Sequence, residues 1–289
     1  MKTLSMYLGS IIGNNDTCIE SLLDDDDVFY DPKKDIVNWI RSNYKITGKL
    51  TILKDYTVNC TGNAFVTNGS ITSLTNGLFK WGKIARHFAC ASCGELISLE
   101  GAPKKVGGDF YCGDCRSLTS LEGAPEKVGR DFDCRDCKNL ISLEGAPKEI
   151  VGNFNCSECE NLTSLEGAPK EVDGGFNCTY CENLTSLEGA PKNVGEEFSC
   201  NYCKKLKNLK GSPEYVGKDF NCIMCDNLIS LEGAPEYVGR DFCCNYCENL
   251  RFLEGAPKKI GGEFRHAGCE KVNYSAAEAN RASYFKSFS

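Results

Sequence analysis

A sequence word recurs along this chain at a fixed interval of 22 residues. The word FYCGDCRSLTSLEGAP begins at Phe110, and close copies begin at Phe132, Phe154, Phe176 and Phe220. A period of about 20 to 50 residues is typical of stacked repeats, because one such unit buries its apolar face only against its neighbours. The interval therefore predicts a single elongated solenoid and argues against a globular core.

The repeat can be numbered from its phenylalanine, which we set as position 0. Cysteines then occupy +2 and +5, leucines +8 and +11, proline +15, and valine or isoleucine +18. The cysteine pairs follow one another without a gap from Cys90 to Cys247, and His266 and Cys269 take the same two places one period later. The array is predicted to cover residues 66–269.

The two ends of the chain are predicted to cap the solenoid, since its first and last repeats would otherwise expose strand edges. In residues 1–65, Asp31 is the expected N-cap of an amphipathic helix, and apolar and polar residues alternate after it as in short strands. In residues 270–289, Ser275 and Glu278 form a capping-box pattern that predicts a second helix.

Charge and composition exclude several classes of function. The net charge is −7 and the pI is near 5.1, which argues against nucleic acid as the main partner. The chain has no run of about 20 apolar residues that could cross a membrane. Its opening, MKTLSMYLGSIIGNN, lacks the cleavage site of a signal peptide and is interpreted as a cap helix. We therefore expect a cytoplasmic protein whose 20 cysteines are free, reduced and buried.

The strand core of each repeat reads Phe-x-Cys-x-x-Cys-x-x-Leu. Phe and the first Cys are two residues apart, so in a strand their side chains point to the same side. The pattern is similar to the leucine-rich-repeat consensus L-x-L-x-x-N/C-x-L with one residue added before the last apolar position. The chain resembles this family, and more closely the repeat proteins of tailed bacteriophages and some bacteria that carry words such as LTSLEGAPKEVGGDFDC. The matching positions are those of Phe110, Cys112, Leu118, Leu121, Gly123, Pro125 and Val128 and their equivalents in the other repeats.

The resemblance implies a β-rich leucine-rich-repeat horseshoe with short helical caps at both ends, whose concave strand face recognises a protein partner. It also implies a phage-encoded, non-enzymatic protein that acts on a host factor or a defence protein in the host cytoplasm. The chain departs from many of these relatives at +5, where they carry Asn and where this sequence has Cys in every repeat from Cys115 to Cys247.

The cysteine spacing leaves a second hypothesis open, which is a zinc-binding structural repeat protein. Cys90 to Cys115 reads C-x2-C-x18-C-x2-C, a spacing found in four-cysteine zinc sites. However, the 18-residue linkers between successive cysteine pairs all have the same length. Zinc sites that join the repeats two by two should instead make alternate linkers differ in length. The array also continues where the pair is replaced by Asn68 and Ile71. A buried ladder of thiols that fills a narrow core explains all of these features without metal and is the favoured interpretation.

No constellation for catalysis is present in the sequence. The two histidines, His87 and His266, lie eight periods apart, so they cannot act together in a stack. Neither has an evident orienting partner for nucleophilic catalysis, and no phosphate-binding glycine loop precedes a helix. We predict a protein that is not an enzyme, and we assign no catalytic, cofactor or metal residues.

The +4 position is the strongest candidate for a binding site. Side chains at +1, +3 and +4 are expected to point away from the core, and the +4 position changes in blocks along the array. Three acidic residues are followed by four large apolar or aromatic residues, namely Asp114, Asp136, Glu158, Tyr180, Tyr202, Met224 and Tyr246. Tyrosine is typical of interface hot spots, and an exposed apolar patch marks an interaction site. The alternative is that these side chains only stack on one another along the sheet.

Overall fold

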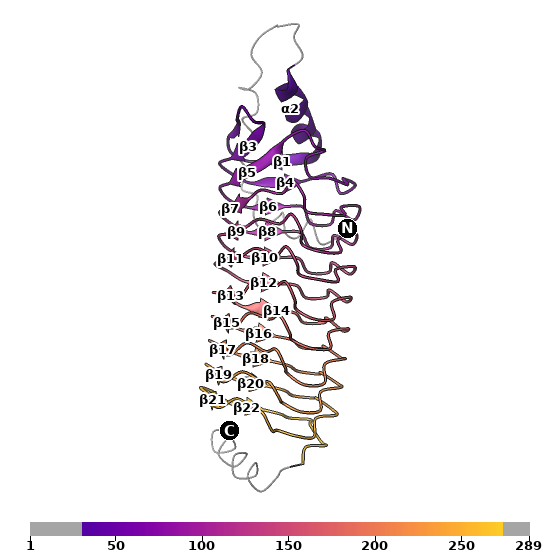
Figure 1. Cartoon of the computed structure of the whole chain (residues 1–289), viewed down its shortest axis with the longest axis vertical. Helices are drawn as coiled ribbons and strands as arrows, with labels where there is room; N and C mark the ends of the chain where they lie inside the picture. Colours follow the sequence, from indigo (N-terminus) through magenta and orange to yellow (C-terminus); the bar gives the residue numbers. More distant parts are fainter. Residues whose placement is uncertain (1–30, 274–289) are drawn as a thin grey trace.

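The chain forms an elongated β-solenoid with a helix at one end. The structure, a computed structural model, describes residues 31–273, so the helices predicted in the opening segment and after Ser275 lie outside the described residues. About ten turns of roughly 22 residues stack in one direction, and each turn is here called a coil. Figure 1 shows the stack as a column, with the N-terminal helix at its top and the last coil at its bottom. The predicted solenoid of 22-residue repeats is confirmed.

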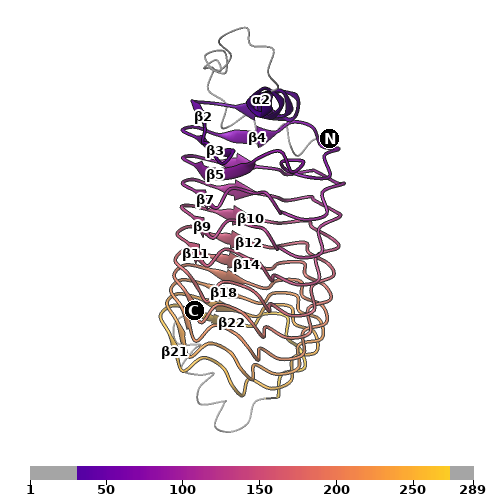
Figure 2. The same ribbon diagram turned by 45° about the horizontal axis from the view of Figure 1, so that its top comes forward.

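The N-terminal cap consists of a helix and short strands. Helix α2 (Pro32–Asn43) begins as predicted, with Asp31 accepting a hydrogen bond from the Lys33 backbone N–H at 2.9 Å. Its apolar face buries Ile36 and Ile40 against the first coils. The strands that follow are β1 (Tyr44–Ile46), β2 (Leu50–Ile52), β3 (Thr57–Cys60), β4 (Ala64–Val66) and β5 (Lys80–Ile84). Strand β1 pairs antiparallel with β4 and covers the open edge of the stack (Figure 1). Figure 2, in which the top comes forward, shows helix α2 lying at the same end, next to β4.

Each phenylalanine begins a short parallel strand, and these strands make one continuous sheet. The sheet runs in the order β1, β4, β6, β8 and onward in even numbers to β22. The nine strands that start at position 0 are β6 (Phe88–Ala89), β8 (Phe110–Tyr111), β10 (Phe132–Asp133), β12 (Phe154–Asn155), β14 (Phe176–Asn177), β16 (Phe198–Ser199), β18 (Phe220–Asn221), β20 (Phe242–Cys243) and β22 (Phe264–Arg265). Phenylalanine pairs with phenylalanine in every step, which is the register the period requires.

Each coil also has a second strand, at +17 and +18, that the sequence pattern did not predict. These strands form a sheet with β2, β3 and β5 in the first part of the column and a separate sheet farther along. They are β7 (Lys105–Val106), β9 (Lys127–Val128), β11 (Glu149–Ile150), β13 (Glu171–Val172), β15 (Asn193–Val194), β17 (Tyr215–Val216), β19 (Tyr237–Val238) and β21 (Lys259–Ile260). Two residues are too few to give a visible alternation of polar and apolar side chains, so the sequence offered no signal for them.

The core is built from columns of identical side chains. The phenylalanine rings stack face to face from Phe88 to Phe264, with centroids 5.1 to 5.4 Å apart. The cysteines at +2 and +5 and the leucines at +8 and +11 are buried beside them from Cys90 to Leu250. Such stacked rings gain about 0.5–1.5 kcal/mol per pair beyond their burial. Repetition of the sequence is therefore what lets one coil fit the next.

The turn at +13 explains the glycine of each Glu-Gly-Ala-Pro word. Gly123 has a φ of 88°, and a Cβ built there would lie 2.4 Å from the backbone nitrogen of Glu100 in the preceding coil. Only glycine fits where one coil approaches the next this closely. The serine before it accepts a hydrogen bond from the backbone two residues later, as Ser142 does from Glu144 at 3.0 Å.

Candidate binding surface on the sheet face

The outer side of the phenylalanine sheet is the candidate binding surface. The backbone N–H groups at 0, +2 and +4 donate to the carbonyls at −1, +1 and +3 of the next coil, for example from Asp136 to Ser157 at 2.9 Å. This ladder leaves the side chains at −1, +1 and +3 on the outside of the sheet, with +4 at its edge. We call these four columns the sheet face.

The +4 residues share an unusual backbone conformation. Their φ angles lie between 55° and 61° at Ser92, Asp114, Asp136, Glu158, Tyr180, Tyr202, Met224 and Tyr246, and Gly268 follows with a φ of 73°. This is the left-handed region, which favours glycine and asparagine and costs other residues roughly 1–2 kcal/mol each. The glycine in the ninth repeat is a sequence signal for this conformation, whereas the tyrosines carry none.

The aromatic half of the predicted site is brought together. Tyr180 and Tyr202 stack with ring centroids 4.3 Å apart and an interplanar angle of 12°. Tyr180 is 41% exposed and Tyr246 is 52% exposed, while Met224, which lies between Tyr202 and Tyr246 in the column, is half-buried. The predicted residues therefore lie in one column at the surface, and Tyr180 and Tyr202 also contact each other.

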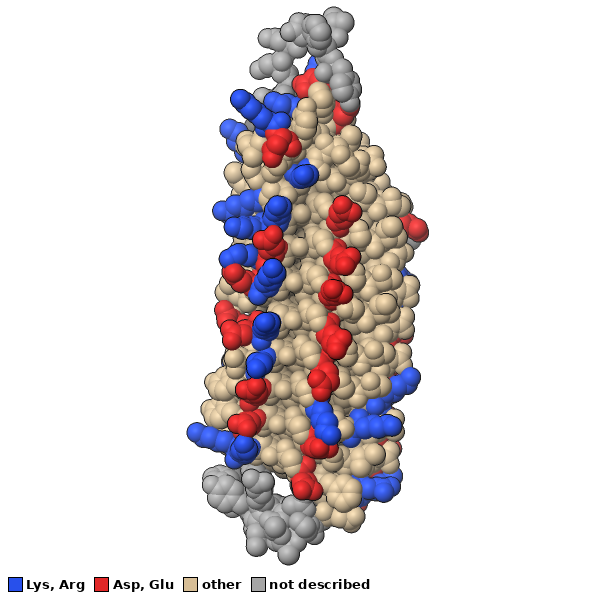
Figure 3. All heavy atoms as spheres, in the orientation of Figure 1, with Lys and Arg blue, Asp and Glu red and all other residues tan. Residues whose placement is uncertain are grey.

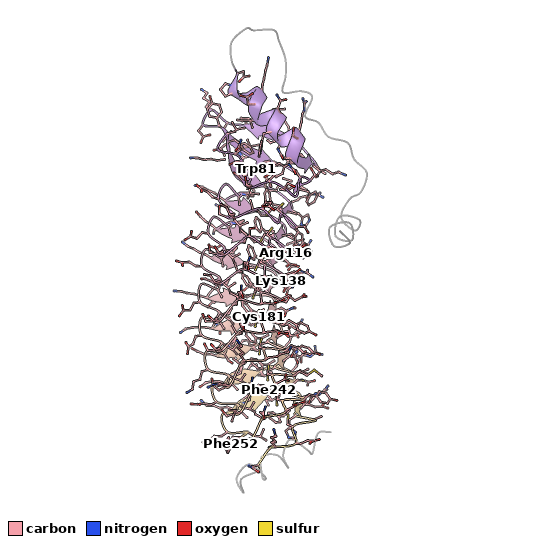
Figure 4. All side chains as sticks on the ribbon, turned by 90° about the vertical axis from the view of Figure 1, so that its right-hand side faces the viewer. Trp81, Arg116, Lys138, Cys181, Phe242 and Phe252 are labelled. Carbon is pink, nitrogen blue, oxygen red and sulfur yellow. The ribbon has the colours of Figure 1, made fainter. Side chains whose placement is uncertain are left out.

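The acidic half of the column is partly paired within the chain. Asp114 accepts a hydrogen bond from the Arg116 Nε at 2.8 Å, and the Lys138 Nζ lies 3.8 Å from the Asp136 carboxylate. Arg116 and Lys138 are the +6 residues of neighbouring coils, and both are labelled in Figure 4. These cations, which the sequence reasoning did not consider, reduce the negative charge available at the first two acidic positions.

A groove of about 440 Å³ lies on the sheet face beside the +4 column. Its walls come from the −1, +1 and +3 columns between Tyr111 and Ser199, together with Glu196 at −2, and they are mostly acidic or amide side chains. Gly175 leaves the −1 column without a side chain in the middle of this stretch. Asp133 and Ser199 at +1 are buried although they belong to the outer side of the sheet, so part of the groove floor is hidden from solvent.

A pair of titratable groups lies at the N-terminal end of the sheet face. The His87 Nδ1 lies 2.8 Å from the Asp109 carboxylate, which also accepts hydrogen bonds from the Tyr111 hydroxyl and the Asp131 backbone. Burial opposes ionisation of Asp109, but these hydrogen bonds outweigh it and lower the pKa of Asp109 to about 2. The arrangement holds neighbouring coils together and contains no nucleophile.

The cysteines at +5 form a ladder of hydrogen bonds. From Cys115 onward, each thiol donates to the carbonyl of the +2 cysteine in the preceding coil, as Cys159 does to Cys134 at 3.3 Å and Cys247 to Cys222 at 3.1 Å. Within residues 31–273 the thiols are free, as expected, and all except that of Cys269 are buried. Burial raises the pKa of Cys112 well above its usual range. A +5 cysteine thus satisfies a backbone group that would otherwise be buried without a partner.

No group of three or more His, Cys, Asp or Glu side chains within residues 31–273 is arranged to hold a metal ion. No helix in the same range has the length and apolarity needed to span a bilayer.

Comparison with protein-family models, with curated proteins and with solved structures finds no match to this chain.

Proposed function

We propose that the chain is a non-enzymatic binding module that recognises a protein partner through its +4 column and the adjoining sheet face. The observation that carries the proposal is the residue choice at +4. Four successive coils place Tyr180, Tyr202, Met224 and Tyr246 in the left-handed conformation, where glycine or asparagine would be less strained. Strained backbone of this kind clusters at functional sites, because the surrounding structure supports side chains that serve another purpose.

The chemistry of the column supports the same proposal. Tyrosine offers a large apolar ring and a hydroxyl with few rotatable bonds, and it is enriched among the residues that dominate binding energy. The column is fixed by the backbone ladder on both sides, so the binding groups are held rigidly before the partner arrives.

The biological setting is proposed from the resemblance described above. A leucine-rich-repeat protein of the phage-encoded kind would act in the host cytoplasm on a host factor or a defence protein. The solenoid fold supports a binding role, because stacked strands offer an extended and rigid surface.

The test uses two tyrosine pairs that differ in backbone conformation. Tyr180→Asn with Tyr202→Asn removes the stacked pair at +4, and asparagine keeps the left-handed turn. Tyr215→Asn with Tyr237→Asn is the matched control, because these rings also stack, at 4.9 Å, but lie in strands β17 and β19 away from the sheet face.

Each protein is immobilised and exposed to lysate, and captured proteins are identified by mass spectrometry, after which the purified partner is titrated. We expect the Tyr180 and Tyr202 substitutions to weaken the partner's affinity at least tenfold and the control pair to leave it unchanged. Equal affinity of both variants, or loss of binding only in the control pair, would contradict the proposed site.

A further inference from the structure

The sheet face carries the negative charge of the whole chain. Its −1, +1, +3 and +4 columns from Asp109 to Gly268 hold ten carboxylates and two guanidinium groups, a net charge of −8. The entire chain has a net charge of −7, with 33 basic and 40 acidic residues, so the remainder is close to neutral. Charge elsewhere also follows columns, but there acidic columns run beside basic or mixed ones, as Figure 3 shows for one face.

Four carboxylates line the groove, and two of them contact a basic side chain. Arg135 contacts Asp133, and the Lys218 Nζ lies 2.7 Å from Glu196. Asp131 and Glu197 also line the groove, and within residues 31–273 neither has an ion-pair partner. Both already accept neutral hydrogen bonds, from the Asn153 and Asn221 side chains respectively, which fix their orientation.

The spacing of the two unpaired carboxylates suits an extended peptide. Asp131 and Glu197 occupy the −1 column three coils apart, which corresponds to roughly 14 Å at about 4.8 Å per coil. Four residues of an extended chain cover about 13 Å and bring the side chain back to the same side. Gly175, which has no side chain, lies between the two carboxylates and leaves room for such a chain.

We propose that the groove binds an extended basic segment of the protein partner, with two arginine or lysine side chains four residues apart contacting Asp131 and Glu197. Arginine suits these positions best, because its planar fork of N–H donors matches a carboxylate. The aromatic +4 residues begin in the same coils as the C-terminal end of the groove, so the partner contacts both. This inference rests on the proposed function and specifies the chemistry of the partner.

The test measures binding of synthetic peptides to the full chain by NMR titration at low ionic strength. The first peptide, Gly-Arg-Gly-Ser-Gly-Arg-Gly, has the spacing of four, and the second, Gly-Gly-Arg-Arg-Ser-Gly-Gly, has the same charge with adjacent arginines. Asp131→Asn with Glu197→Gln removes the two charges, and Asn153 shows that asparagine is accepted in this column. Glu122→Gln with Glu144→Gln removes the same charge from exposed +12 positions and serves as the control.

We expect the spaced peptide to bind at least fivefold more tightly than the adjacent one, and to lose at least fivefold in affinity on the Asp131 and Glu197 variant only. Equal binding of the two peptides, or equal loss in both variants, would overturn the inference. A third outcome is that the peptides show neither the preference for the spaced arginines nor the loss on the Asp131 and Glu197 variant, while the Tyr180 and Tyr202 substitutions still weaken partner binding. That outcome would overturn the inference and leave the proposed function standing without a basic segment. If the peptides behave as expected and the tyrosine substitutions leave partner binding unchanged, the groove is retained and the +4 column is not the site.

Discussion

The inward columns of the solenoid and its +4 column follow opposite rules. Position 0 is phenylalanine in all nine coils from Phe88 to Phe264, whereas +4 changes from serine to acids, to tyrosine and methionine, and to glycine. Inside, each side chain must match the one above it, because rings stack and thiols reach the carbonyl of the preceding coil. At +4 the backbone conformation repeats but the side chain faces solvent. Variation in an otherwise uniform array therefore marks where selection acts on something other than the fold.

The largest effect should come from breaking an inward column. Phe176 is 1% exposed and stacks on Phe154 at 5.1 Å and on Phe198 at 5.4 Å. Phe176→Ala should lower the free energy of unfolding by roughly 3–5 kcal/mol, measured by urea denaturation. Phe252→Ala, at a ring that is 47% exposed, should change it by less than about 0.5 kcal/mol. Similar losses in the two variants would show that the ring column is not the main source of stability.

A smaller effect tests whether every outward residue is free to vary. Asp109 belongs to the sheet face, but its carboxylate binds His87, Tyr111 and the backbone of Asp131. Its folded pKa of about 2 lies below the unfolded value of about 3.9, so the folded state favours the ionised form. The resulting stability, roughly 2 kcal/mol, is present above pH 4 and is lost as the pH falls through about 2.

Asp109→Asn should therefore destabilise the protein by roughly 2 kcal/mol at pH 7, and the difference from the wild type should shrink toward pH 2. Urea denaturation at pH 7, 4 and 2.5 measures this change. A difference that stays constant over this range would show that the carboxylate charge contributes nothing and that only packing is lost.

The thiol ladder should have a still smaller effect per residue. Cys159→Ala leaves the Cys134 carbonyl without its donor and should cost roughly 1–2 kcal/mol. Cys159→Ser supplies a hydroxyl donor at the same place and should recover part of that loss. If the serine variant is less stable than the alanine variant, the sulfur at +5 acts as an apolar filler and the hydrogen bond is unimportant.

The sequence predicted the repeating parts of the structure and missed those that depend on backbone geometry. The 22-residue spacing of Phe110 and its copies predicted the stack, the strand at each phenylalanine and the buried cysteines, because identical coils pack on one another in the same way at every step. It did not reveal the left-handed turn at Tyr180, because tyrosine carries no signal for that conformation. The sequence also did not predict the groove between Asp131 and Glu197, because its walls are side chains from separate repeats that only the fold brings together.

If the +4 tyrosines are present for binding and not for stability, the fold should tolerate their removal. The most direct measurement is the free energy of unfolding of the protein with Tyr180→Asn and Tyr202→Asn. Asparagine relieves part of the left-handed strain of roughly 1–2 kcal/mol per residue, whereas the lost ring contact is worth up to about 1 kcal/mol. We predict a variant at least as stable as the wild type. A loss of more than about 1 kcal/mol would show that the stacked pair, with its centroids 4.3 Å apart, stabilises the fold, and would contradict a role in binding alone.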